Sequence, residues 1–150
     1  MPTRDAASAT TLLEFRTELD APMDRVFATL TESAHLARWL SDEATSDPAA
    51  GGRVVLGWKR EGSSTDPFSG RWVVFQPPTS CAFEGGHPGH PDGYGGRIGF
   101  EIAPRGATGS VLITRHRLPT RLDYEPVIAD YRTAWPRALE RLVAYLTPAV

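Results

Sequence analysis

The sequence feature that most constrains the fold is an apolar stripe near the C-terminal end. In "YEPVIADYRTAWPRALERLVAYL" (124–146), apolar side chains recur at steps of three and four residues, which places them on one face of an α-helix. They are Ile128, Tyr131, Trp135, Ala138, Leu139, Leu142 and Leu146. Pro136 interrupts the stripe without shifting its phase, so the pattern predicts one long helix kinked at Pro136, with a helix broken there as the alternative. A helix of roughly 20 residues is about 30 Å long, enough to cover a whole sheet.

The middle of the chain changes to a period of two, which is typical of strands with one buried face. Turn-forming residues separate the alternating segments, and this close succession predicts an antiparallel meander. The expected strands are residues 53–60, 68–76, 80–84, 97–104 and 110–118. Near the N-terminus, "TLLEFRTELDAP" alternates in the same way, with Leu13, Phe15, Thr17 and Leu19 on one face, and predicts a first strand.

Two short helices are expected between the first strand and the meander. Asp20 can cap the first helix and Pro22 suits its first turn, and "MDRVFATLT" supplies a buried stripe. "SAHLARWL" (33–40) predicts a second helix capped by Ser33, and the composition of residues 41–52 indicates a loop. The order of elements predicts an α+β fold, with a curved antiparallel sheet of about six strands wrapped around the long C-terminal helix. We expect one domain over residues 1–150, with a frayed end at 1–10.

Composition excludes several classes of protein. The formal net charge of −2 supplies no broad basic surface, so we expect no nucleic-acid partner. No apolar run approaches the roughly 20 residues that a membrane span needs. "MPTRDAASATT" does not resemble a signal peptide, and Cys81 is the only cysteine, so the sequence predicts a cytoplasmic protein without disulfides or a cysteine metal cluster.

Five segments together resemble the START-like, helix-grip (SRPBCC) superfamily, and within it the homologues of the activator of heat-shock-protein-90 ATPase. They are "APMDRVFATLTESAHLARWL" (21–40), "GGRVVLGW" (51–58), "GRWVVFQPPTSCAF" (70–83), "SVLITRHRLP" (110–119) and "AWPRALERLVAYL" (134–146). The resemblance implies a helix-grip fold, a cavity for a small hydrophobic ligand such as a lipid or polyketide, no cofactor, and homodimerisation. It also leaves open a role in the stress response, through a chaperone.

His116 is the strongest candidate for chemistry in such a cavity. It alternates with Leu112, Thr114 and Leu118, while the other face of the strand carries Arg115 and Arg117, so His116 is expected to point inward. A histidine among apolar residues can donate a hydrogen bond to a ligand carbonyl or act as a general acid or base. It can equally be a core histidine bonded to a neighbouring hydroxyl or carbonyl.

Aromatic residues supply the expected cavity walls, although each could instead pack in the core. Trp72 is expected to face outward, because Val73 and Phe75 compete with it for the inner face. The residues predicted to line the cavity are Trp39, Trp58, Phe83, Thr114, His116, Tyr131 and Trp135.

The segment "EGGHPGHPDGYGG" (84–96) carries His87, His90 and Asp92, whose donor atoms suit zinc or nickel. Its glycines and prolines form no element that could fix those ligands. We therefore expect a mobile hairpin loop near the mouth of the cavity and no metal site.

The sequence contains no recognised catalytic signature, and Cys81 is expected to pack rather than react. It favours binding of a small hydrophobic ligand between the sheet and the C-terminal helix. The alternatives are an enzyme of the cyclase or aromatase type that uses His116, and an interaction protein of a chaperone or stress regulator.

Overall fold

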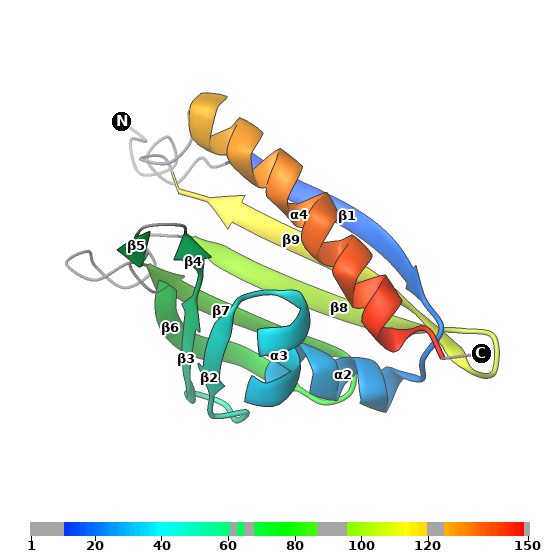
Figure 1. The fold of residues 1–150 in the computed structure, drawn as a ribbon. Helices are drawn as coiled ribbons and strands as arrows, with labels where there is room; N and C mark the ends of the chain where they lie inside the picture. Colours follow the sequence, from blue (N-terminus) through cyan, green and yellow to red (C-terminus); the bar gives the residue numbers. More distant parts are fainter. Residues whose placement is uncertain (1–10, 61–62, 65–67, 87–95, 120–124, 149–150) are drawn as a thin grey trace, which may run out of the picture.

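The computed structural model describes residues 11–60, 63–64, 68–86, 96–119 and 125–148. This part of the chain forms a sheet of seven antiparallel strands with three helices on one face (Figure 1). The strands lie in the order β1 (Thr11–Leu19), β9 (Gly109–Leu118), β8 (Arg97–Arg105), β7 (Ser80–Gly86), β6 (Phe68–Gln76), β3 (Arg53–Gly57) and β2 (Glu43–Ser46). The helices are α2 (Met23–Thr31), α3 (Ser33–Trp39) and α4 (Glu125–Leu146), and a two-stranded ribbon pairs β4 (Lys59–Arg60) with β5 (Ser63–Ser64). The predicted helix-grip fold is confirmed.

The long helix α4 lies across the sheet above β9 and β1 (Figure 1). On the same face, α3 packs next to β2, and α2 packs against β8 and β9. Helix α4 continues as one helix through Pro136, so the alternative of a broken helix is wrong. All of its predicted apolar stripe is buried except Tyr131, which is half-buried.

The sheet has one strand more than expected, because β2 falls within residues predicted to be a loop. Three of its four side chains are polar and none is fully buried, so the sequence gives only a weak alternating signal there. The strand forms because β3 pairs with it from Glu43 to Ser46, and because Ser33 holds its far edge. The Ser33 hydroxyl accepts a hydrogen bond from the Ser46 backbone N–H (2.8 Å) and donates one to the Ser46 carbonyl (3.3 Å).

Both predicted helix caps are wrong. Pro22 is the residue that caps α2 and Glu32 the one that caps α3, and neither makes a side-chain capping bond. Asp20 accepts instead a hydrogen bond from Arg105 at 3.0 Å, and Ser33 is occupied by β2. In both cases a partner distant in the sequence replaces the local one.

Trp72 is 1% exposed and faces the core, which contradicts the expectation that it faces outward. The reason is a β-bulge between Trp72 and Val74, which leaves Val73 as an extra residue on the outer side, 42% exposed. A bulge places two residues opposite one on the neighbouring strand and so resets the alternation. Trp72 and Phe75 therefore both reach the inner side, with their rings 5.9 Å apart.

The core consists of two unequal clusters. The large one joins α2, α3 and the C-terminal half of α4 to the middle of the sheet. The small one contains Leu13, Leu118 and Ile128, where the first turns of α4 meet β1 and β9. Phe15 and Tyr131 pack against both clusters and mark the boundary between them.

Two polar contacts fix the C-terminal half of α4 to α3. Arg141 donates a hydrogen bond from Nε to the Trp39 carbonyl at 2.9 Å. The Tyr145 hydroxyl is hydrogen-bonded to His35 Nδ1 at 2.7 Å. This half of the helix is therefore held by apolar burial and by hydrogen bonds together.

Candidate functional site

The candidate site begins with two rows of side chains that cross the inner face of the sheet. Strand pairing aligns the first row from Leu13 through His116, Ile98 and Phe83 to Trp72. The second row runs from Phe15 through Thr114, Phe100 and Cys81 to Phe75. The register thus brings predicted site residues from two strands, β7 and β9, onto one surface, with the polar pair Thr114 and His116 under α4.

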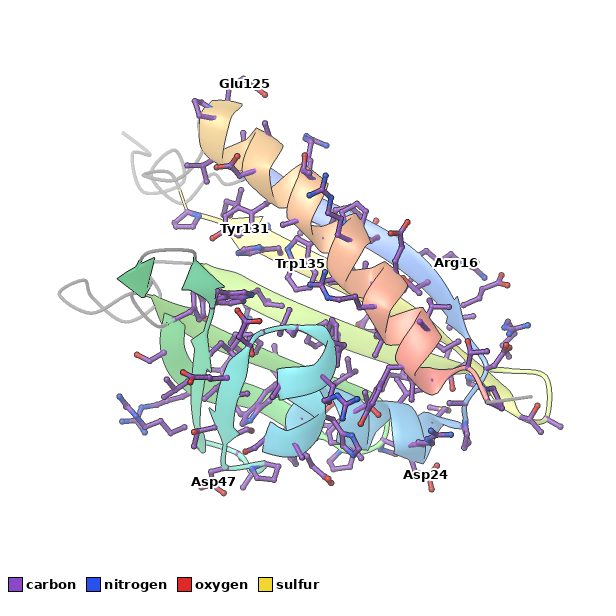
Figure 2. All side chains as sticks on the ribbon, viewed as in Figure 1. Arg16, Asp24, Asp47, Glu125, Tyr131 and Trp135 are labelled. Carbon is purple, nitrogen blue, oxygen red and sulfur yellow. The ribbon has the colours of Figure 1, made fainter. Side chains whose placement is uncertain are left out.

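His116 is fully buried and is held by two aromatic residues of α4. The Trp135 indole N–H donates to His116 Nδ1 at 3.1 Å. The Tyr131 ring lies edge-on to the imidazole, with centroids 4.5 Å apart. Tyr131 and Trp135 are one helical turn apart, and Figure 2 shows both on the side of α4 turned toward the sheet.

The bond from Trp135 decides which tautomer His116 adopts when neutral. An indole nitrogen only donates, so Nδ1 must accept and the ring proton lies on Nε2. A neutral His116 is therefore a hydrogen-bond donor at Nε2. The predicted inward position of His116 is confirmed.

Thr114 carries the least satisfied polar group on this surface. Its side chain is fully buried, and its hydroxyl has no hydrogen-bond partner among the described residues. A buried hydroxyl without a partner costs about 1–3 kcal/mol, and most such groups in folded proteins are paired. The Thr114 hydroxyl is thus available for a partner that is not part of the described chain.

Tyr131 remains a neutral phenol over a wide pH range. Burial, with a smaller effect of the Asp130 carboxylate, raises the pKa of its hydroxyl above the usual value. No carboxylate, ammonium or guanidinium group belongs to the buried residues of the described chain. The inner surface is therefore mainly apolar, with a few polar atoms and no buried charged group among the described residues.

Trp39 joins the site through an aromatic chain. The Phe100 ring lies 6.3 Å from Trp135 and 6.3 Å from Trp39. The Trp39 indole N–H donates to the Thr29 carbonyl at 3.0 Å, which fixes its orientation. Phe100 was not among the predicted site residues, although its alternation with Ile98 and Ile102 in "RIGFEIAP" could have identified it.

Phe83 and Trp58 lie farther from this centre. Phe83 is in the same row as His116, but its ring contacts are Phe68 at 5.8 Å and Trp72 at 5.3 Å. Trp58 is half-buried and donates to the Leu40 carbonyl at 2.9 Å, at the end of α3. Phe83 therefore lies toward β6, and Trp58 lies at the end of α3. The other five predicted residues lie together around His116: Trp39, Thr114, His116, Tyr131 and Trp135.

The described residues contain no set of three or more His, Cys, Asp or Glu side chains that could hold a metal ion. The candidate ligands His87, His90 and Asp92 lie outside them, between the paired strands β7 and β8. Cys81 is buried, and burial raises the pKa of its thiol to about 12. A thiol that holds its proton so strongly is a poor nucleophile at neutral pH.

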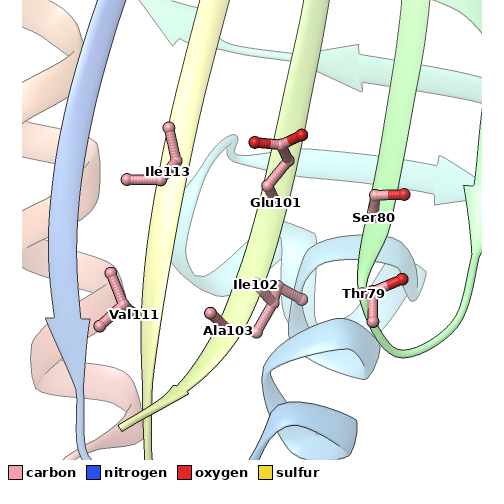
Figure 3. Close-up of a pocket in the computed structure, with 7 residues that line it drawn as sticks. All are labelled: Thr79, Ser80, Glu101, Ile102, Ala103, Val111 and Ile113. Carbon is pink, nitrogen blue, oxygen red and sulfur yellow. The ribbon is translucent and has the colours of Figure 1, made fainter.

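An open depression of about 380 Å³ lies on the opposite, outer face of the sheet (Figure 3). It is lined by Thr79, Ser80, Glu101, Ile102, Ala103, Val111 and Ile113. None of these is a predicted site residue, and α4 lies on the other side of the sheet (Figure 1). This depression is therefore distinct from the surface around His116.

Comparison with known proteins identifies the family. A sequence model of the family described as "Activator of Hsp90 ATPase homolog 1-like protein" matches residues 20–147, which include all three helices and most of the sheet. The chain belongs to this family. The predicted branch of the helix-grip superfamily is thereby confirmed. A search of curated proteins found no match. Among the described helices, none is long and apolar enough to span a membrane.

Solved structures confirm the fold of this chain. CalU16 from Micromonospora echinospora is 22% identical, with 93% of this chain and 78% of that chain covered and a TM-score of 0.69. The Aha1 dimer from Colwellia psychrerythraea is 14% identical, with coverage of 91% and 96% and a TM-score of 0.70. An HSP90 activator from Plasmodium falciparum is 17% identical, with coverage of 90% and 95% and a TM-score of 0.70. At these identities the likeness concerns the fold alone.

Proposed function

We propose that this protein binds a small, mainly apolar molecule with an oxygen acceptor, between the inner face of the sheet and α4. The observation that carries the proposal is the buried Thr114 hydroxyl, which has no partner among the described residues and lies next to an imidazole fixed by Trp135. A ligand oxygen would accept a hydrogen bond from this hydroxyl and remove the cost of leaving it unpaired.

The surroundings favour a neutral ligand with a flat or aromatic body. Phe15, Phe100, Tyr131 and Trp135 surround Thr114 and His116 with apolar surface. Because no charged residue of the described chain is buried, a ligand charge would lose its hydration without gaining a counter-ion. Aromatic polyketides and flavonoids fit these requirements better than the carboxylate end of a fatty acid.

The test combines native mass spectrometry of untagged protein with calorimetric titration of aromatic polyketides, flavonoids and fatty acids. Thr114→Val should weaken the best ligand about fivefold to tenfold, which corresponds to one hydrogen bond. Thr29→Val is the matched control, because Thr29 is equally buried but its hydroxyl donates to the Arg25 carbonyl within α2. Equal affinity of the two variants, or the absence of binding to all three ligand classes, would count against the proposal.

A second candidate is proton transfer by His116 in a cyclase or aromatase reaction. The Trp135 contact orients the imidazole and leaves the proton on Nε2, so the role it favours is that of a general acid. His116→Ala should then abolish turnover of a polyketide substrate while ligand binding persists. Unchanged turnover would eliminate the enzyme hypothesis.

A third candidate is an interaction with a cytoplasmic chaperone. It is supported by the family description and by the HSP90 activator from Plasmodium falciparum among the structures of the same fold. Affinity capture from a cytosolic extract should return a chaperone in stoichiometric amount, and capture without one would weaken this candidate.

A further inference from the structure

The two edges of the sheet differ in how their backbone groups are used. At one edge, β2 is four residues long, and Ser33 occupies both the N–H and the carbonyl of Ser46. At the other edge, β1 is nine residues long, and among the strands of the described chain it pairs with β9 alone. A long edge strand presents a row of backbone groups on which another strand can pair.

The outward side chains of β1 alternate in charge, with Glu14, Arg16 and Glu18 in succession after Leu12. Charges on an edge strand usually prevent two copies from pairing. Here Arg16 contacts Glu18 at 3.0 Å in an exposed pair, and such pairs contribute little stability. Arg16 can therefore exchange this partner for another carboxylate.

Pairing with a second copy restricts the possible registers. When two copies of a strand pair antiparallel about a two-fold axis, the numbers of every two facing residues add up to the same sum. This sum must be even, because facing residues lie on the same face of the sheet. A sum of 30 places Phe15 on the axis and aligns the whole strand with itself, so that Glu14 faces the partner's Arg16 on both sides of the axis. A sum of 32 would oppose Arg16 to Arg16, and a sum of 28 would oppose Glu14 to Glu14. A sum of 34 would again oppose unlike charges, Arg16 to Glu18, but it pairs only residues 15–19. The charges and the length of the pairing together therefore favour the sum of 30.

We propose that two copies of this chain associate through β1 in this register and form one continuous sheet across the two-fold axis. Glu14 and the partner's Arg16 form the cross-strand ion pairs on the outer face, and the half-buried Phe15 meets its symmetry mate on the inner face. The ion pairs of this interface lie on the outer face of the sheet, whereas Thr114 and His116 lie on the inner face under α4.

The test measures the molar mass of the chain by sedimentation equilibrium over a concentration series. The wild type should shift from the 16.4 kDa chain mass toward twice that value. Glu14→Arg and Arg16→Glu should each weaken the dimer at least about tenfold, because each turns two attractive cross-strand pairs into repulsive ones. The double variant Glu14→Arg/Arg16→Glu should restore the dimer, since the swapped charges are complementary again.

Glu101→Arg is the matched control. Glu14 and Glu101 both contact Arg115, at 2.6 and 2.5 Å, but Glu101 lies on β8, away from the edge. This variant should leave dimerisation unchanged, and circular dichroism should confirm that all variants are folded. A wild type that stays monomeric at every concentration would overturn the proposal. So would a dimer that persists in both single variants, or a double variant that fails to recover.

Discussion

The two halves of α4 have different surroundings. The C-terminal half buries Leu139, Leu142 and Leu146 in the large cluster, and hydrogen bonds from Arg141 and Tyr145 join it to α3. The N-terminal half has a small apolar cluster around Ile128, followed by aromatic residues that face two polar side chains of β9. The C-terminal half of α4 is thus the firmly packed anchor of the helix. The N-terminal half faces polar groups of which one, the Thr114 hydroxyl, has no hydrogen-bond partner among the described residues.

This difference separates stability from recognition. A well-packed core gains free energy from every buried methylene, whereas a buried hydroxyl without a partner reduces stability. The packing of the C-terminal half can offset the cost of the Thr114 hydroxyl, which the proposed function assigns to a ligand. The predictions below test this division, beginning with the largest expected effect.

Truncation of the two halves should cost unequal amounts of stability. Leu142 is 0% exposed in the large cluster and Ile128 is 9% exposed in the small one. Leu142→Ala should lower the free energy of unfolding by about 3–5 kcal/mol and Ile128→Ala by about 2 kcal/mol, because the larger cluster leaves the larger cavity. Urea denaturation measures both, and equal losses would contradict the division.

Removal of one indole donor should affect His116 only when the donor is Trp135 on α4, and not when it is Trp39 on α3. Trp135→Phe should cost about 1–3 kcal/mol, because it leaves a buried imidazole nitrogen without its donor. It should also change the nitrogen-15 chemical shifts of His116. Trp39→Phe is the control, since that indole donates to the Thr29 carbonyl. It should cost a similar amount of stability and leave the His116 shifts unchanged, and a response of His116 to both variants would refute the local role of Trp135.

Alkaline pH should destabilise the fold through two buried groups, Cys81 on β7 and Tyr131 on α4. Burial raises the pKa of Cys81 from the ordinary value of 9.0 to about 12, and it raises that of Tyr131 above its ordinary value of 10.0. The unfolded chain loses these protons first, so stability is complete below pH 9 and falls as the pH rises toward 12. Each group contributes up to about 1.4 kcal/mol per pH unit between its two pKa values.

Chemical denaturation at several pH values measures this slope. Cys81→Ala should remove the part that begins near pH 9, and Tyr131→Phe the part that begins near pH 10. A slope that neither variant changes would assign the effect to other groups.

The smallest effect is expected at the contact between α3 and α4. Tyr145→Phe removes the hydroxyl bonded to His35, and because this site is partly exposed the loss should be about 0.5–1 kcal/mol. The same variant should leave ligand affinity unchanged, because Tyr145 belongs to the anchoring half. A loss of affinity comparable to that of Thr114→Val would show that the two halves are coupled.

Periodicity predicted the elements whose burial pattern is strong. The stripe on α4 and the alternation on β1, β8 and β9 gave their orientation, including the inward position of His116. These segments combine apolar and polar residues at a fixed period, so the sequence contains the information locally.

The errors arose where distant partners decide. Ser33 holds β2 instead of capping its own helix, and Asp20 binds Arg105. The bulge at Val73 resets the face of Trp72, and no local pattern announces it. Likewise, the bond from Trp135 to His116 depends on how α4 lies over β9, which only the assembled fold determines.

That bond also gives the protein an optical reporter. The other three indoles donate to oxygen atoms, of Thr29, Leu40 and Ser46, whereas the Trp135 indole ends on an imidazole nitrogen. A molecule that engages His116 or displaces Trp135 changes the surroundings of this indole most, while Trp58 and Trp72 lie farther away and serve as an internal reference. Difference absorption and emission spectra of the unmodified chain therefore test the proposed binding site directly, without a dye or a label.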